Sequence, residues 1–139
     1  MRTVDPKTRI EVLDRQECLR LLATQEIGRL VSIDHGQPHV VPVNYALDGD
    51  AIVFRTAMGT KVDAASRSQV AFEVDDLCRA DHSGWSVVVH GWAQEVTALD
   101  DRALVARVAE LRMAAWADFD KPHVLRIVPH TITGRRVGS

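Results

Sequence analysis

Apolar and polar residues alternate along most of the chain in short runs rich in Val, Ile and Phe. Turn residues separate these runs, a pattern that predicts β-strands. The predicted strands cover residues 27–34, 40–47, 51–56, 70–75, 85–97 and 123–128, with a continuation over 131–137. The first three follow one another through tight turns and form an antiparallel meander. Pro38 and Pro42 indicate that the second strand is an edge strand or carries a bulge, because proline cannot donate to a ladder.

Two of these strands differ in their predicted burial. Residues 70–75 alternate strictly, which is typical of a strand with one face in the core. Residues 85–97 contain an uninterrupted apolar centre, Val87–Val89, which predicts burial on both faces and a place in the middle of the sheet. Gly91 within this strand predicts a bulge or a bend.

Three segments have the spacing of short helices. Asp14 and Glu17 form a capping box that opens a helix over residues 14–24, with Leu13 placed as a hydrophobic staple. A second helix is expected to open at Thr60. A third is expected from Asp100, stapled by Leu99 and ending between residues 112 and 116.

Six strands with short helices and no repeated βαβ unit predict a mainly β fold, a closed six-stranded antiparallel barrel. The length of 139 residues fits one domain, which we place at residues 13–139. Residues 1–12 lack a clear period, and we expect them to form an extension that trails across the surface or over a partner subunit.

Composition narrows the functional classes. The net charge of −2 provides no basic field for nucleic acid. No apolar run reaches the ~18 residues of a membrane helix, and the N-terminus has no signal-peptide pattern, so we expect a cytoplasmic protein without a membrane partner. Cys18 and Cys78 lack the spacing of metal ligands and are expected to be thiols, so neither a metal nor a disulfide is predicted.

The strongest chemical signal lies where the strand 51–56 ends. Arg55 and Thr56 close the strand, and Gly59, Thr60 and Lys61 follow at the expected start of a helix. Free backbone N–H groups at a helix start, beside two cations, favour a phosphate. The alternative interpretation is that both cations are solvated at an exposed strand end.

Other polar and aromatic residues favour structural roles. His35 and His39 are expected at the surface near a turn, and Trp92 and Trp116 in the core or a dimer interface. His90 fits either a cross-strand contact or a donor facing a cleft. The sequence Asp81-His82-Ser83 is no evidence of hydrolysis, because adjacency along the chain does not give triad geometry.

Five short segments in register resemble the pyridoxamine 5′-phosphate oxidase-like proteins of the FMN-binding split-barrel class, and more closely their small single-domain branch. The matching segments are Gly28-Arg29-Leu30, Pro42-Val43-Asn44-Tyr45, Phe54-Arg55-Thr56, Gly59-Thr60-Lys61 and Ile132-Thr133-Gly134-Arg135-Arg136, within Leu13 to Val137. Trp85 and Ser86 match a strand start that lies near the flavin in this family.

The resemblance implies a homodimer with two FMN sites in clefts between the subunits. The strand Pro42–Tyr45 would lie along the isoalloxazine ring, and Arg55 with Thr56 would contact the ribityl-phosphate arm. Lys61 would bind the phosphate. The resulting candidate cofactor-binding residues are Pro42, Val43, Asn44, Tyr45, Arg55, Thr56, Lys61, Ser66, Trp85 and Ser86.

The implied function is a flavin-dependent oxidoreductase acting on a small molecule, with NADPH or NADH as a candidate donor. The sequence shows no match to the arginine- and histidine-bearing C-terminal segment of the authentic oxidase, although Arg126, Arg135 and Arg136 supply cations. Two alternatives stay open, F420 dependence and a non-catalytic flavin or haem carrier or sensor. The catalytic residues stay unassigned.

Overall fold

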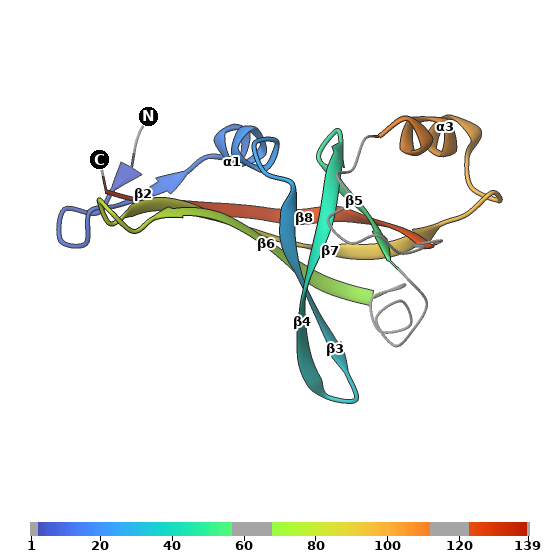
Figure 1. The fold of residues 1–139 in the computed structure, drawn as a ribbon, viewed down its shortest axis with the longest axis horizontal. Helices are drawn as coiled ribbons and strands as arrows, with labels where there is room; N and C mark the ends of the chain where they lie inside the picture. The colour runs from blue at the N-terminus through green and yellow to red at the C-terminus, as the bar shows by residue number, and fades with distance from the viewer. Residues whose placement is uncertain (1–2, 57–67, 112–122, 139) are drawn as a thin grey trace.

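The computed structural model describes residues 3–56, 68–111 and 123–138, and these form one sheet with two helices (Figure 1). Alternating Val, Ile and Phe favour strands because β-branched and aromatic side chains pack well on a pleated surface. The elements are β1 (Thr3–Val4), β2 (Ile10–Leu13), α1 (Arg15–Leu22), β3 (Ile27–Asp34), β4 (Gln37–Asp48), β5 (Ala51–Thr56), β6 (Ser68–Cys78), β7 (Ser83–Val96), α3 (Arg102–Glu110) and β8 (His123–Val137).

Six of the strands close into an antiparallel barrel. The order is β8-β5-β4-β3-β6-β7, and β7 pairs back with β8 to complete the ring. This confirms the predicted six-stranded split barrel. β4 changes partners along its length: in the described residues, 37–44 pair with β3 alone and 45–48 pair with β5. Pro38 and Pro42 therefore lie on an edge, as the sequence predicted.

The N-terminal residues differ from the prediction. They do not simply trail across the surface, because β1 pairs with β2 and β2 pairs with β8, from Ile10 opposite Val137 to Leu13 opposite Gly134. β5 pairs only with residues 123–127 of β8. The same edge of β8 pairs with β2 at residues 134–137. A four-residue strand is too short to show a period in sequence.

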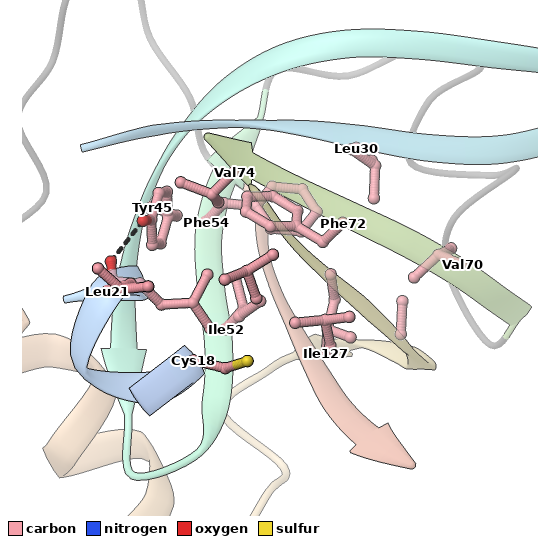
Figure 2. Packing of buried hydrophobic residues seen from close by; sticks show 14 of the residues in the cluster. Cys18, Leu21, Leu30, Tyr45, Ile52, Phe54, Val70, Phe72, Val74 and Ile127 are labelled. Atoms are coloured by element: carbon pink, nitrogen blue, oxygen red, sulfur yellow. Dashed lines mark hydrogen bonds between the residues drawn. The ribbon is translucent and has the colours of Figure 1, made fainter. Parts of the chain in front are cut away.

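The core fills the barrel and extends under α1 (Figure 2). β6 alternates as predicted, with Val70, Phe72 and Val74 buried. The ring of Phe72 meets the ring of Tyr45 edge to face at 5.2 Å between centroids and stacks on Phe54 at 6.3 Å. These aromatic contacts occupy the centre of the barrel.

α1 closes over this core at one side of the barrel. Its N-cap is Asp14, whose carboxylate accepts from the backbone N–H of Glu17 at 2.8 Å, which is one half of the predicted capping box. The Glu17 carboxylate accepts from Arg20 and Arg136 instead of completing the box. Cys18, Leu21 and Leu22 form the buried face of α1. The predicted helix over 14–24 is thus confirmed, with its regular part at Arg15–Leu22.

The burial of β7 and the continuity of β8 differ from the predictions. β7 is not buried on both faces: Val87 and Val89 are fully buried, Val88 is half-buried and Trp92 is 40% exposed. Trp92 is therefore not a core residue. The bulge predicted at Gly91 is present as a shift of register between His90 and Gly91, opposite Pro129. β8 consequently runs through Pro129 as one strand.

α3 starts one residue later than predicted. The cap is Asp101, which accepts from the N–H groups of Ala103 and Leu104, whereas Asp100 accepts from Thr97. Leu99 is 97% exposed, so it does not form the predicted hydrophobic staple. The helix ends at Glu110, before the predicted range.

Two further predictions lie outside the described residues. The helix expected to open at Thr60 falls in 57–67, and Trp116 falls in 112–122. Among the residues that are described, no helix has the length and apolar character needed to cross a membrane.

Candidate functional site

The middle of β4 and the end of β5 form one candidate surface. The turn at Gly49, with φ of 63°, joins the two strands and sets a register in which Tyr45 is opposite Phe54. Successive side chains of a strand point to opposite faces, so Asn44 and Arg55 share the outer face of the barrel. Pro42 lies on the same face, two residues before Asn44.

Arg55 is the exposed cation of this surface. Its side chain projects from a strand whose other members, from Ala51 to Phe54, are fully buried. The guanidinium group of Arg55 forms no hydrogen bond or ion pair with any residue of the described ranges. The neighbouring Asn44 and Thr56 are nearly buried, at 9% and 8% exposure. A guanidinium held on a rigid strand end without a protein anion is suited to an external anion.

Tyr45 and Val43 point the other way, into the barrel. The Tyr45 hydroxyl donates to the carbonyl oxygen of Leu22 at the end of α1 (Figure 2), and burial raises the pKa of this phenol. Val43 is half-buried against the same core. These two residues therefore present their backbone, and not their side chains, to a ligand lying outside the barrel.

Lys61 and Ser66 lie outside the described residues. Their predicted contacts with a phosphate stay predictions.

Trp85 and Ser86 lie at the other end of the molecule, where β7 begins. They line a cavity of about 650 Å³ together with residues of β2, the β6–β7 turn and the end of β8. The full lining is Ile10, Leu77, Cys78, Arg79, His82, Ser83, Gly84, Trp85, Ser86, Arg135 and Val137.

Within the described residues, one chain does not bring the predicted site residues together. Val124 of β8 is opposite Arg55, whereas Arg135 is opposite Ser86. These two points of β8 are eleven residue steps apart, which corresponds to roughly 36 Å along the strand at ~3.3 Å per residue. In Figure 1 the β6–β7 turn lies with both termini at the left, and β5 ends to the right. The structure thus groups Pro42–Tyr45 with Arg55 and Thr56, apart from Trp85 and Ser86.

Arg79 and His82 belong to the second group, and the sequence did not identify either of them as a candidate binding residue. They lie in the β6–β7 turn, and only the fold places them beside Arg135. The other two arginines considered near the C-terminus have protein partners. Arg126 donates to Asp48 at 3.1 Å, and Arg136 donates to Glu17 at 2.7 Å.

A pair of carboxylates lies on the outer face between the two groups. Arg29, which is opposite Pro42, donates to Glu73 at 3.0 Å and to Asp75 at 3.2 Å. Burial, followed by the neighbouring Asp75, raises the pKa of Glu73 to about 7, although Arg29 opposes the shift. Glu73 can therefore hold or release a proton near neutral pH.

The remaining histidines agree with surface roles. His35 and His39 are exposed, and His90 points outward beside its partner Thr131. In the Asp81-His82-Ser83 turn, the Ser83 hydroxyl donates to Asp81, so no serine-histidine contact is formed there. In the described part of the chain, no group of three or more His, Cys, Asp or Glu side chains is arranged to hold a metal ion.

Comparison with known proteins gives a consistent family. Residues 14–136 match the family described as pyridoxamine 5′-phosphate oxidase. An uncharacterized protein of Mycobacterium tuberculosis is 38% identical over 98% of this chain and 92% of its own length. The structure of the FAD binding protein from Mycobacterium smegmatis is similar with a TM-score of 0.71 and 34% identity, covering 93% of this chain and 99% of that one.

A characterised enzyme matches a shorter part of the chain. The 5a,11a-dehydrotetracycline/5a,11a-dehydrooxytetracycline reductase of Streptomyces rimosus is 37% identical over 57% of this chain and 61% of its own length. The family match itself spans nearly every element of the barrel, from α1 to the end of β8. This chain therefore belongs to the pyridoxamine 5′-phosphate oxidase-like family of flavin-binding split barrels.

Proposed function

We propose that the protein is a homodimeric, FMN-dependent oxidoreductase that acts on a small molecule. The observation that carries the proposal is Arg55, an exposed guanidinium without a protein anion in the described ranges, on the same rigid face as Pro42 and Asn44. This arrangement fits a cofactor that combines a terminal dianion with a planar ring.

The roles of this chain's residues follow from their positions. Arg55 binds the flavin phosphate as a planar fork, with Thr56 beside it and with Lys61 and Ser66 contributing from the segment that follows. The backbone of Pro42–Tyr45 supports the ring and supplies hydrogen bonds to its edge. When bound, the flavin supplies hydride or electron transfer between a nicotinamide or other donor and the substrate.

The separation of the two residue groups supports a site shared by two subunits. Trp85 and Ser86 lie too far along the barrel from Arg55 to meet the same flavin, so the partner subunit supplies them. The outer face also carries exposed apolar side chains suited to a subunit contact. Trp92 and Val128 are a cross-strand pair, 40% and 46% exposed, and Val40 of β4 is 61% exposed.

Oxidoreductase activity is favoured over a passive carrier by one relative. The reductase from Streptomyces rimosus is named for a dehydrotetracycline substrate, and its similarity to part of this chain supports a reductive function. The FAD binding protein from Mycobacterium smegmatis makes FAD the second cofactor to test.

The test is a flavin titration of the purified protein, followed by its absorption spectrum and by quenching of flavin fluorescence. We expect one FMN per chain and a particle of twice the 15.4 kDa chain mass in size-exclusion chromatography with light scattering. Arg55→Ala should weaken FMN binding by about tenfold or more, the usual value of a charge-assisted hydrogen bond. The matched control is Arg102→Ala, which removes an exposed arginine from α3.

The outcomes separate the alternatives. Equal FMN affinity in Arg55→Ala and Arg102→Ala would rule out the proposed phosphate site. If F420, FAD or haem binds more tightly than FMN in the same titration, that molecule is the cofactor in place of FMN. FMN binding without oxidation of NADPH or NADH, in the presence of a panel of acceptors, would favour a carrier or sensor.

A further inference from the structure

The cavity at the β6–β7 turn combines a cationic rim with apolar walls. We infer that it is a binding site for a small organic anion with an apolar body, such as a carboxylate or sulfonate attached to a ring system. Its volume of about 650 Å³ falls within the roughly 300–1,000 Å³ typical of small-molecule sites.

The cationic side consists of Arg79 and Arg135, and the imidazole of His82 lies beside them. Arg79 and His82 come from the turn and Arg135 from β8, and none of the three side chains forms a hydrogen bond or ion pair within the described part of the chain. Basic side chains gathered without protein anions favour an anionic ligand.

Two of the nearby acids, Asp81 and Asp75, are already occupied by other donors, whereas Asp76, which is opposite Trp85, is exposed. Asp81 accepts from the hydroxyl and the backbone N–H of Ser83, the latter at 3.1 Å, and these bonds lower its pKa. Asp75, which is opposite Ser86, accepts from Arg29 at 3.2 Å. Neither of these two carboxylates pairs with Arg79 or Arg135, whose guanidinium groups give the rim its positive charge.

The apolar wall of the cavity contains large hydrophobic side chains that are unusually exposed to solvent. Leu77 is 71% exposed and Val137 is 43% exposed, although both are large hydrophobic residues at the ends of regular strands. Ile10 of β2, which pairs with Val137, extends the same wall. A ligand body that covers these side chains would gain about 25 cal/mol for each Å² of apolar area removed from water.

The backbone of the turn is fixed in shape rather than loosely exposed. Gly84 has φ of 157°, and a Cβ there would lie 2.6 Å from the carbonyl oxygen of Asp76. His82 adopts φ of 55°, a left-handed conformation that positions its side chain next to the cavity. The backbone that carries His82 and Gly84 therefore has a defined shape before any ligand binds, which lowers the entropic cost of ordering the turn.

The assignment of this ligand as the substrate rests on the proposed function. If the partner subunit supplies Trp85 and Ser86 to the flavin, the cavity that these residues line opens beside the flavin ring. The substrate class would then be an amphipathic organic anion. Binding of such an anion to the cavity does not itself require the flavin.

The test uses 8-anilinonaphthalene-1-sulfonate, a fluorescent ring system with one negative charge, and its uncharged analogue N-phenyl-1-naphthylamine. Both are titrated into the full-length protein, its Arg79→Ala/Arg135→Ala variant and the control Arg102→Ala. We expect the sulfonate to bind the double variant about tenfold more weakly than the wild type, since charge-assisted hydrogen bonds are lost. The uncharged analogue should bind all three proteins within about twofold, and Arg102→Ala should match the wild type.

Several results would overturn the inference. These are a wild-type protein that does not bind the sulfonate, a double variant that binds it as tightly as the wild type, or an equal loss for the uncharged analogue. FMN is titrated in parallel into the same proteins. If the double variant loses as much affinity for FMN as for the sulfonate, the two arginines bind the flavin instead. If the wild type binds no flavin but the sulfonate pattern holds, the proposed function fails and the anion site stands.

Discussion

Gly28 of β3 lies against the aromatic centre of the barrel, and Gly28→Ala tests that packing directly. A Cβ at this position would lie 2.2 Å from Cε1 and 2.4 Å from Cζ of Phe72, and 3.0 Å from a methyl group of Val74. Phe72 is fully buried between Tyr45 and Phe54, so its ring has little room to move away.

Two effects of opposite sign compete in this substitution. Replacing glycine by alanine in a strand stabilises a protein by about 0.5–1 kcal/mol, because the unfolded chain loses freedom. Overpacking a dense core costs about 1–3 kcal/mol, and the contacts of 2.2 and 2.4 Å to a rigid ring place Gly28→Ala at the upper part of that range. The net loss should be about 1–2 kcal/mol, or about 3–7 °C in Tm for a chain of this length.

A double-mutant cycle identifies the cause. Phe72→Leu removes the two ring atoms that the new methyl group would strike, so it should relieve the strain while costing about 1 kcal/mol by itself. The free energies of unfolding from urea titrations should show a favourable coupling of about 0.5 kcal/mol or more between the two substitutions. Additive effects, or a Gly28→Ala protein as stable as the wild type, would refute the packing described for Phe72.

Three further predictions address other parts of the fold. Tyr45→Phe should lower the free energy of unfolding by about 1–3 kcal/mol in urea titrations, because the buried Leu22 carbonyl loses its donor; an unchanged midpoint would contradict that role. The raised pKa of Glu73, from 4.5 to about 7, means that its protonated form favours folding, so that contribution is complete below pH 4.5 and is lost as the pH rises through 7. The stability of Glu73→Gln relative to the wild type should therefore rise between pH 5 and pH 8. If the free energies of unfolding of the two proteins change in parallel with pH, the pKa of Glu73 is not raised. Folded protein should react rapidly with a thiol reagent at Cys78 alone, and Cys18 should react only after denaturation, as a spectrophotometric thiol count can show.

Local signals predicted the elements whose structure is decided within a few residues. Asp14 and Glu17 identify the start of α1 because the cap, its partner and the following apolar residues lie within one turn. The alternation around Phe72 identifies β6 for the same reason, since a strand with one face in the core has a period of two.

The failures occur where distant parts of the chain decide the outcome. β2 forms because the edge of β8 near Gly134 is left open by β5, a fact that no local pattern records. Val88 was expected to be buried like its neighbours, but it lies on the outer face opposite Glu73, where burial depends on what covers the barrel. An apolar residue type alone does not show that a second layer is present.

The same distinction applies to the candidate site. Arg55 was identifiable because a strand end, a cation and a turn follow one another in sequence. Arg79 and His82 resemble ordinary solvated residues of a polar turn, and their significance depends on Arg135, more than fifty positions later. The signal that could have found them is the pairing of β7 with β8, which brings Ser86 opposite Arg135.

β8 explains why one subunit presents two cationic surfaces instead of one. A strand that pairs with β5 at its beginning and with β2 and β7 at its end joins two separate neighbourhoods, one at Arg55 and one at Arg135. The interval is roughly 36 Å along the strand, so we expect a single small ligand not to reach both surfaces of the same chain. The homodimer that we propose removes this restriction if its isologous interface brings one subunit's first surface against its partner's second surface, a contact that the two-fold axis repeats. Two equivalent clefts, each built from two chains, would then form, and substitutions of Arg55 and Arg135 would test this arrangement by their different effects on flavin and anion binding.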